Sequence, residues 1–312
     1  MNKLPPIIFI IGPTASGKTG LAIKLMEHFP IELISVDSAL VYKGMDIGTA
    51  KPGKEELAKA PHRLISFLDP AEPYSAASFR KDALKEIKEI SKMGKIPVLV
   101  GGTMLYYRAL EYGLADLPEA NQKIRAEISK QAELQGWAYL HSQLKEIDPD
   151  SAGRIHPNDK QRIQRALEVY KITGKSLTYL QKKASMQALP YRIFKIALIP
   201  ESRDWIRDLA AKRFDSMLQH GFIEEVKTLY ERGDLSPDLP SMRSVGYRQI
   251  WDYLDGKTSF EEMRELAITA TRQLAKRQMT WMRSEKNINT YNAKEYDLDK
   301  IIADITKFLK DS

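Results

Sequence analysis

The feature that most constrains this sequence is a glycine-rich loop that follows an apolar run and precedes a helical pattern. It reads Gly12-Pro13-Thr14-Ala15-Ser16-Gly17-Lys18-Thr19 and fits G-x-x-x-x-G-K-[ST] in the strand–loop–helix context that the motif requires. The glycines let backbone N–H groups converge on an anion, and the helix N-terminus adds partial positive charge. Lys18 would supply a point charge and Thr19 a hydroxyl ligand for Mg²⁺. The loop predicts a bound diphosphate or triphosphate without identifying the molecule.

Short apolar runs alternate with helical patterns in the first part of the chain and recur after residue 190. The predicted strands are Ile7–Ile11, Ile31–Val36, Ile96–Val100 and Tyr191–Ile199, with a further one at 287–291. The predicted helices are 18–28, 74–93, 120–134, 138–147, 159–173, 205–220, 222–232, 249–254, 260–283 and one from Asp297. This alternation predicts an α/β fold, a P-loop core with a parallel sheet flanked by helices.

The stretch between the third and fourth strands shows only helical patterns. We therefore expect an all-helical insertion domain over residues 115–186 and a catalytic core over 1–114 and 187–312, whose C-terminal part is helical. Charge is also uneven, since residues 151–192 hold nine Lys or Arg and two acids, and the remainder holds 39 of each. The whole net charge of +7 thus falls in one block, which favours a polyanion docking there over a merely solvated helix surface.

Composition excludes several classes of protein. The chain has no cysteine, so disulfides, thiolate chemistry and cysteine-ligated clusters are excluded, and a reducing cytoplasmic location is expected. No apolar run approaches the length of ~18 residues that a membrane span needs, which predicts no membrane partner.

The nearest candidate carboxylate at a strand end is Asp37, which ends the second strand beside the phosphate loop. P-loop ATPases and nucleotide kinases usually carry a carboxylate on a later strand to hold Mg²⁺. Here that strand ends Gly101-Gly102-Thr103, without an acid. From the residues alone, Asp37 could support a metal through water or act as a base on an acceptor.

Several longer stretches together resemble the tRNA dimethylallyltransferase (tRNA isopentenyltransferase) family. They span residues 7–283 and comprise the phosphate loop, Ser35–Pro52, Pro61–Leu64, Tyr74–Ala77, Gly101–Tyr106, Asn158–Arg165, Val245–Gln249 and Thr280–Arg283. The phosphate loop alone is widely shared, but the combination is specific. The resemblance implies transfer of a dimethylallyl group from dimethylallyl diphosphate to the exocyclic amine of the adenine 3′-adjacent to the tRNA anticodon. It also implies that the loop and Mg²⁺ hold the diphosphate of the donor.

The resemblance implies roles for particular residues. Asp37 would be the general base, Thr103 would bond near the reacting amine, and Arg213 would join residues 12–19 on the diphosphate. Ser38, Ala39 and Leu40, with Asp37 and Thr103, would line the adenine. The remaining expected tRNA contacts are Arg125, Gln161, Arg162, Ile163, Gln164, Arg165, Arg243, Gly246, Tyr247, Arg248, Lys276, Arg277, Trp281 and Arg283.

Members of this family flip the adenine out of the anticodon loop to reach it. The expected partners are therefore a tRNA anticodon stem-loop and dimethylallyl diphosphate, and we expect a monomeric enzyme. Three alternatives differ in substrate: an adenylate isopentenyltransferase acting on free nucleotide, a P-loop nucleotide kinase, and an RNA-binding NTPase.

Overall fold

The structure is a computed structural model of the 312-residue chain, and it describes residues 4–115, 117–184 and 189–311. The strands are β1 (Pro6–Ile11), β2 (Ile31–Val36), β3 (His62–Arg63), β4 (Ile96–Gly101), β5 (Arg192–Ile199) and β6 (Ile288–Asn292). The helices are α1 (Lys18–Met26), α2 (Lys54–Lys59), α3 (Ala76–Lys92), α4 (Met104–Tyr112), α5 (Gln122–Gln135), α6 (Trp137–Ile147), α7 (Pro149–Arg154), α8 (Lys160–Thr173), α9 (Leu177–Ala184), α10 (Arg203–Gln219), α11 (Phe222–Tyr230), α12 (Tyr247–Leu254), α13 (Phe260–Ser284) and α14 (Leu298–Lys310).

The strands form one parallel sheet in the order β3-β2-β4-β1-β5-β6, which confirms the predicted α/β class. β4 lies between β1 and β2 although it follows both in the chain. In the register, Gly101 pairs with Ile11 on one side and with Val36 on the other. The segments that leave β1, β4 and β2 therefore start at the same level of one sheet edge, where ligands of open α/β sheets bind.

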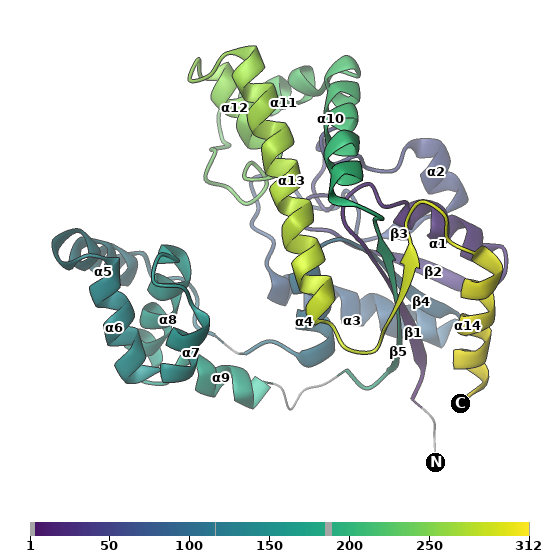
Figure 1. Cartoon of the computed structure of the whole chain (residues 1–312), viewed down its shortest axis with the longest axis horizontal. Helices are drawn as coiled ribbons and strands as arrows, with labels where there is room; N and C mark the ends of the chain where they lie inside the picture. The colour runs from purple at the N-terminus through teal and green to yellow at the C-terminus, as the bar shows by residue number, and fades with distance from the viewer. Residues whose placement is uncertain (1–3, 116, 185–188, 312) are drawn as a thin grey trace. The chain divides into compact units, whose positions relative to one another are not determined.

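Helices cover both faces of this sheet. On one face, buried residues of β1, β2, β4 and β5 pack against α1 and α14, which lie on the same side in Figure 1. On the other face, α3 contacts β2 and β4, and Tyr107 of α4 packs on Phe9 with ring centroids 4.9 Å apart. The Tyr107 hydroxyl donates to the carbonyls of Ile10 and Leu99, so α4 is fixed to the two central strands.

A second apolar core joins the helices that follow β5. It packs α10, α11, α12 and α13 around buried Phe222, Tyr247 and Trp251, and it includes Val41, Tyr42 and Met45 from the segment after β2. These helices form the upper part of Figure 1. Their predicted bounds agree with the structure to within about two residues, whereas α2, α4, α7 and α9 and the short strand β3 were not predicted.

The chain divides into two compact units, one holding residues 4–107 and 190–311 and the other lying within Arg108–Leu189. The described residues of the second unit contain helices and no strand, as the sequence predicted. Its apolar core is built from α5, α6, α7 and α8 around Ile128, Leu140 and Ile163. Within the described residues, no helix is both long and apolar enough to cross a membrane.

Candidate active site

A cavity of about 340 Å³ opens at the sheet edge where β1, β2 and β4 end. Three groups of predicted site residues line it: Thr14–Thr19 from the loop after β1, Asp37 with Ala39 and Leu40 from the segment after β2, and Arg213 from α10. Gly246 lines it as well. Residues separated by up to about 230 positions in the chain therefore meet around one space.

The phosphate loop has the backbone that its glycines predict. Gly17, directly before α1, has φ +80°, in the left-handed region where a side chain is disfavoured, and Ala15 has φ +65°. A methyl group at Gly12 would lie 2.4 Å from the Ser16 hydroxyl, so a side chain there would not fit. The Ser16 hydroxyl is buried and has no hydrogen-bond partner among the described residues, although it lines the cavity.

Two cationic side chains line the cavity, Lys18 from α1 and Arg213 from α10. The Lys18 ammonium donates to the Pro13 carbonyl at 2.7 Å, and Arg213 is half-buried on α10. The pKa of Lys18 is lowered to about 8, chiefly by burial; Asp37 opposes this shift and Arg213 adds to it. Burial also lowers the pKa of Arg213, which Asp37 again opposes. A dianion between Lys18 and Arg213 would compensate for both desolvated charges.

The low pKa of Lys18 predicts a pH effect on binding of a diphosphate ligand. Above pH about 8 the free enzyme has lost the Lys18 proton, whereas an ammonium beside a bound anion keeps it. We therefore expect ligand binding above this pH to take up about one proton, and affinity to fall by roughly tenfold per pH unit. Calorimetry in buffers of different ionisation enthalpy measures the uptake. Lys18→Met should abolish it, and an unchanged proton uptake in this variant would contradict the assignment.

Asp37 is half-buried at the start of the segment after β2. Its Oδ1 accepts hydrogen bonds from the backbone N–H of Ala39 at 2.8 Å and of Leu40 at 3.3 Å. Its Oδ2 has no hydrogen-bond partner within the described part of the chain. One carboxylate oxygen thus shapes the turn while the other can accept a proton.

Thr103 is hydrogen-bonded to both sides of Asp37. Its hydroxyl accepts from the backbone N–H of Ser38 at 3.1 Å, and its own N–H donates to the Val36 carbonyl at 3.2 Å. Because the hydroxyl oxygen accepts, the Thr103 O–H remains able to donate. Neither Thr103 nor Ser38 is among the described residues that line the 340 Å³ cavity; Thr103 is half-buried and Ser38 is exposed.

The glycine at the end of β4 allows β4 to lie close to the backbone of β2. A methyl group at Gly101 would lie 2.0 Å from the Val36 carbonyl oxygen, which is fixed in the neighbouring strand. A side chain at Gly101 would push β2 and β4 apart and would displace Asp37, which directly follows Val36.

Glu225 of α11 was not singled out in the sequence, yet it holds the loop that forms another wall of the cavity. Its carboxylate accepts from the backbone N–H groups of Asp46, Ile47 and Gly48 at 2.9, 2.7 and 3.2 Å. The Tyr247 hydroxyl donates to the same carboxylate. Glu225 lies 177 to 179 residues from these amides, and no local pattern marks it.

The structure corrects the expected role of Tyr247. Its side chain is fully buried, its hydroxyl binds Glu225, and its ring packs on Phe222 with centroids 5.0 Å apart. A side chain enclosed in this way stabilises the wall and does not contact a tRNA. Arg248 and Arg243 are exposed, and Arg243 forms an ion pair with Asp238 at 3.4 Å.

In the second unit, the five residues expected to contact tRNA at the start of α8 separate into two groups. Gln161 and Arg162 are exposed, and the Arg162 side chain, 67% exposed, lies 3.3 Å from Asp159. Ile163 is fully buried in the helical core. Gln164 donates its amide to the Arg125 carbonyl and to Ser129. The expectation of an RNA contact is therefore corrected for the side chain of Ile163, whereas Gln164 is half-buried and its RNA contact stays a prediction.

Arg165 and Arg125 both bind the buried carboxylate of Glu168. Arg165 lies 2.7 Å and Arg125 2.9 Å from its oxygens, and the Asn121 N–H donates to it as well. Burial would raise the pKa of Glu168, but the bonds from Arg125 and Arg165 lower it overall. Arg165 also donates to the Pro118 carbonyl. Both arginines therefore have a structural role, and the Arg165 side chain is less exposed than that of Arg162 (28% against 67%).

The different surroundings of Arg162 and Arg165 predict different effects when each is replaced by alanine. If tRNA binds the surface, Arg162→Ala should flatten the salt dependence of tRNA affinity by roughly 0.7–0.9 per lost phosphate contact, with little change in stability. Arg165→Ala should lower the free energy of unfolding by about 1–3 kcal/mol, because it removes one of two cations from a buried carboxylate. Filter binding across salt concentrations and denaturant titration of the full chain measure both. The reverse pattern would contradict this division.

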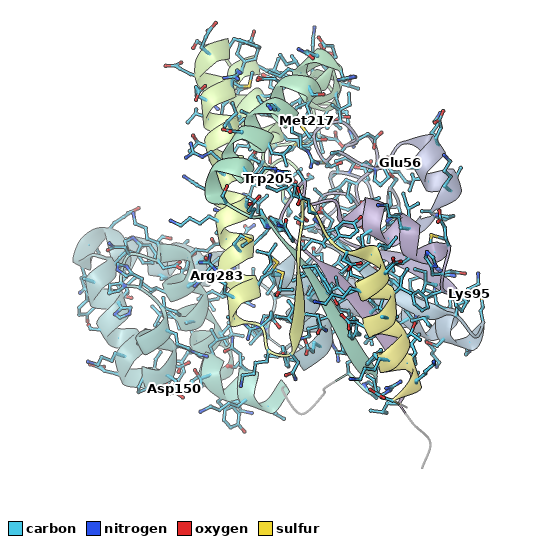
Figure 2. The ribbon with its side chains drawn as sticks, turned by 45° about the vertical axis from the view of Figure 1, so that its right-hand side comes forward. Glu56, Lys95, Asp150, Trp205, Met217 and Arg283 are labelled. Carbon is cyan, nitrogen blue, oxygen red and sulfur yellow. The ribbon has the colours of Figure 1, made fainter. Side chains whose placement is uncertain are left out.

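The basic residues expected on the last long helix are exposed. Lys276, Arg277 and Arg283 lie on α13, and Trp281 is half-buried. A second cavity of about 420 Å³ is lined by Arg272, Lys276 and Arg283 together with Pro200–Ser202 before α10. Figure 2 shows Arg283 near the C-terminal end of α13 and Met217 on α10. This side of α13 is a positively charged groove in the first unit.

A phosphate loop at the end of a central parallel strand, facing a carboxylate and a second cation across one cavity, defines a P-loop protein with a site for a phosphorylated ligand. Residues 40–285 match the family model described as IPP transferase. The chain belongs to this IPP transferase family.

Relatives and solved structures agree with this assignment. The chain is 56% identical over 306 residues to the tRNA dimethylallyltransferase of Thioalkalivibrio sulfidiphilus, covering 98% of this chain and 96% of the relative. It is 53% identical over 307 residues to that of Coxiella burnetii, covering 98% and 99%. Its structure resembles the tRNA isopentenylpyrophosphate transferase of Bacillus halodurans, with TM-score 0.71, 38% identity, and 99% and 96% coverage. It also resembles a eukaryotic dimethylallyltransferase solved while acting on tRNA, with TM-score 0.82, 28% identity, and 98% and 80% coverage.

Proposed function

We propose that this protein transfers a dimethylallyl group from dimethylallyl diphosphate to the exocyclic amine of the adenine 3′-adjacent to the tRNA anticodon. In this reaction the bond from C1 of the donor to the diphosphate oxygen breaks with its electron pair on oxygen. A bond from the amine nitrogen to C1 forms, and the amine loses one proton. The products are isopentenyladenosine in tRNA and free diphosphate. The observation that carries the proposal is the common cavity of the phosphate loop, Arg213 and Asp37.

The donor side follows from the loop and its cations. Diphosphate leaves readily only when its developing charge is neutralised, and Lys18, Arg213 and the phosphate loop at residues 14–19 surround the place where it would lie. The described residues hold no cluster of three or more Asp, Glu or His side chains suited to a metal. Mg²⁺ needs few protein ligands when a substrate supplies phosphate oxygens, so the Thr19 hydroxyl beside the diphosphate fits it, with Asp37 at the same cavity. When bound, Mg²⁺ would neutralise further negative charge on the diphosphate.

The acceptor side follows from the segment after β2. The free oxygen of Asp37 would take the amine proton as the new bond forms, since an aryl amine is a weak nucleophile. Ala39 and Leu40 would line the adenine at the cavity wall. The Thr103 hydroxyl would position Ser38 and the Asp37 turn through its bond to the Ser38 N–H. Its O–H, which is not used by this bond, would donate a hydrogen bond near the reacting amine.

The acceptor must be presented from a large RNA. An adenine inside a stacked anticodon loop is out of reach and has to be flipped out, at a cost of a few kcal/mol that phosphate contacts can offset. Exposed Gln161 and Arg162 in the helical unit, and Arg243, Arg248, Lys276, Arg277 and Arg283 in the other unit, offer such contacts. We propose that residues 115–186 form a tRNA-binding insertion and that the basic groove of α13 contacts the same RNA. We propose that the enzyme acts as a monomer on tRNA in the cytoplasm.

The decisive comparison is between acceptors. With labelled dimethylallyl diphosphate and Mg²⁺, we expect label in an anticodon stem-loop with adenine beside the anticodon and none in the same stem-loop carrying guanine there. AMP should remain unlabelled, because it offers no contact to the basic surfaces. Efficient labelling of AMP would instead identify an adenylate isopentenyltransferase. Phosphate transfer from ATP, or ATP hydrolysis stimulated by RNA, would identify a kinase or an NTPase.

A further inference from the structure

One side chain of α13 joins the phosphate loop to the end of β4. The Gln278 Oε1 accepts from the backbone N–H of Thr14 at 3.1 Å, and its Nε2 donates to the Gly102 carbonyl at 2.9 Å. The side chain is half-buried and lines the 340 Å³ cavity. Its bond to Thr14 spans 264 residues of sequence.

The two hydrogen-bond partners of Gln278 lie in the donor-binding and acceptor-binding parts of the proposed site. Thr14 is in the loop that would hold the diphosphate of the donor. Gly102 precedes Thr103, whose N–H binds the Val36 carbonyl and whose hydroxyl binds the Ser38 N–H. Hydrogen bonds of Gln278 and Thr103, joined by the peptide bond between Gly102 and Thr103, thus connect the phosphate loop to the residues on either side of Asp37.

The glycine at position 102 preserves the space for this contact. A methyl group there would lie 2.5 Å from the Gln278 Nε2, so Gly102 is the residue that lets the amide approach. The Gly102 carbonyl also accepts from the Met104 N–H at 3.1 Å, so it keeps a partner without Gln278. For the Thr14 N–H, Gln278 is the acceptor that the described residues provide. Loss of Gln278 therefore acts first on the phosphate loop.

We propose that Gln278 is a positioning residue. It fixes the position of the phosphate loop relative to the strand end that carries Asp37, so that the donor carbon and the acceptor amine are held at reacting distance. This inference rests on the function proposed above and adds a residue to it. An amide suits the task because it offers one acceptor and one donor in a fixed plane. Orientation of two reactants in one site contributes strongly to rate, and small displacements are costly.

Three variants test the proposal from different sides. Gln278→Met keeps the length of the side chain without either hydrogen bond. We expect it to lower kcat/KM for dimethylallyl diphosphate by roughly tenfold to a hundredfold, the value of two hydrogen bonds. Gly102→Ala should give a similar loss by displacing the same amide. Affinity for the tRNA stem-loop should stay unchanged in both. Gln219→Leu, at the exposed C-terminal residue of α10, is the matched control and should behave as wild type.

The third variant, Gln278→Glu, supplies a readout that a purely structural role would not give. A neutral carboxylic acid can accept from Thr14 and donate to Gly102, whereas a carboxylate can only accept and would repel the Gly102 carbonyl. The activity of Gln278→Glu relative to wild type should therefore rise as pH falls, while that of Gln278→Met relative to wild type should not change with pH.

If the wild-type enzyme modifies the stem-loop and Gln278→Met has the same kcat/KM for the donor as wild type, the positioning role is overturned and the proposed function stands. A pH-independent ratio for Gln278→Glu would overturn it as well. If wild type itself transfers no dimethylallyl group, the proposed function fails instead. Thermal unfolding of each variant, measured in parallel, shows that activities are compared between folded proteins.

Discussion

Asp37→Ala is expected to lower kcat by ~10²–10⁴-fold, the contribution of a general base, while tRNA affinity is largely kept. The carboxylate lines the cavity beside the phosphate loop, and one of its oxygens makes no hydrogen bond within the described residues. Removing it leaves no group at this position to take the proton of the amine. Single-turnover rates with saturating donor and stem-loop measure the chemical step, and filter binding measures tRNA affinity.

Asp37→Asn separates this chemical role from the structural one. An asparagine oxygen can still accept from the N–H groups of Ala39 and Leu40, so the turn should persist, but the amide cannot take a proton at neutral pH. We expect Asn to lose nearly as much activity as Ala. Asp299→Asn, on the exposed first turn of α14, is the control and should be fully active. If Asp37→Asn keeps the wild-type rate, Asp37 shapes the turn and is not the base.

Lys18→Met is expected to lower kcat by ~10²–10³-fold and to weaken donor binding, because a preorganised charge at the leaving diphosphate is lost. The Lys18 side chain is half-buried at the cavity, where desolvation lowers its pKa to about 8 and strengthens its interaction with an anion. Single-turnover rates and calorimetric donor affinity measure the two effects.

The control for Lys18 lies on the same helix. Lys24 is exposed near the C-terminal end of α1 and contacts the ring of Tyr296 at 5.3 Å, away from the cavity. Lys24→Met should leave both rate and donor affinity unchanged. Equal effects of the two substitutions would mean that Lys18 contributes only general charge or stability.

The fold and the phosphate loop could be predicted because their signals are local. A buried strand, a glycine loop and an amphipathic helix follow one another within about 20 residues, and the parallel register then brings Asp37 to the same edge. Arg213 was expected from family resemblance alone, since an arginine on a long helix has no local feature that assigns it to an anion.

The parts that sequence reasoning missed depend on long-range contacts. Glu225 and Gln278 act on backbone groups 177 and 264 residues away, and neither lies in a recognisable motif. The roles of Arg162 and Arg165 could not be separated by their spacing, because one faces solvent and the other binds the buried Glu168. The available signal was Glu168 itself, an acid three residues after Arg165 among the apolar positions of α8.

The most direct test of the central claim is mass analysis of nucleosides from tRNA that has been incubated with the purified protein, dimethylallyl diphosphate and Mg²⁺. The proposed function predicts an adenosine heavier by one C₅H₈ unit, located 3′-adjacent to the anticodon, and an equal amount of released diphosphate. No modified adenosine with wild-type protein, or one whose amount is the same with Asp37→Asn, would contradict it.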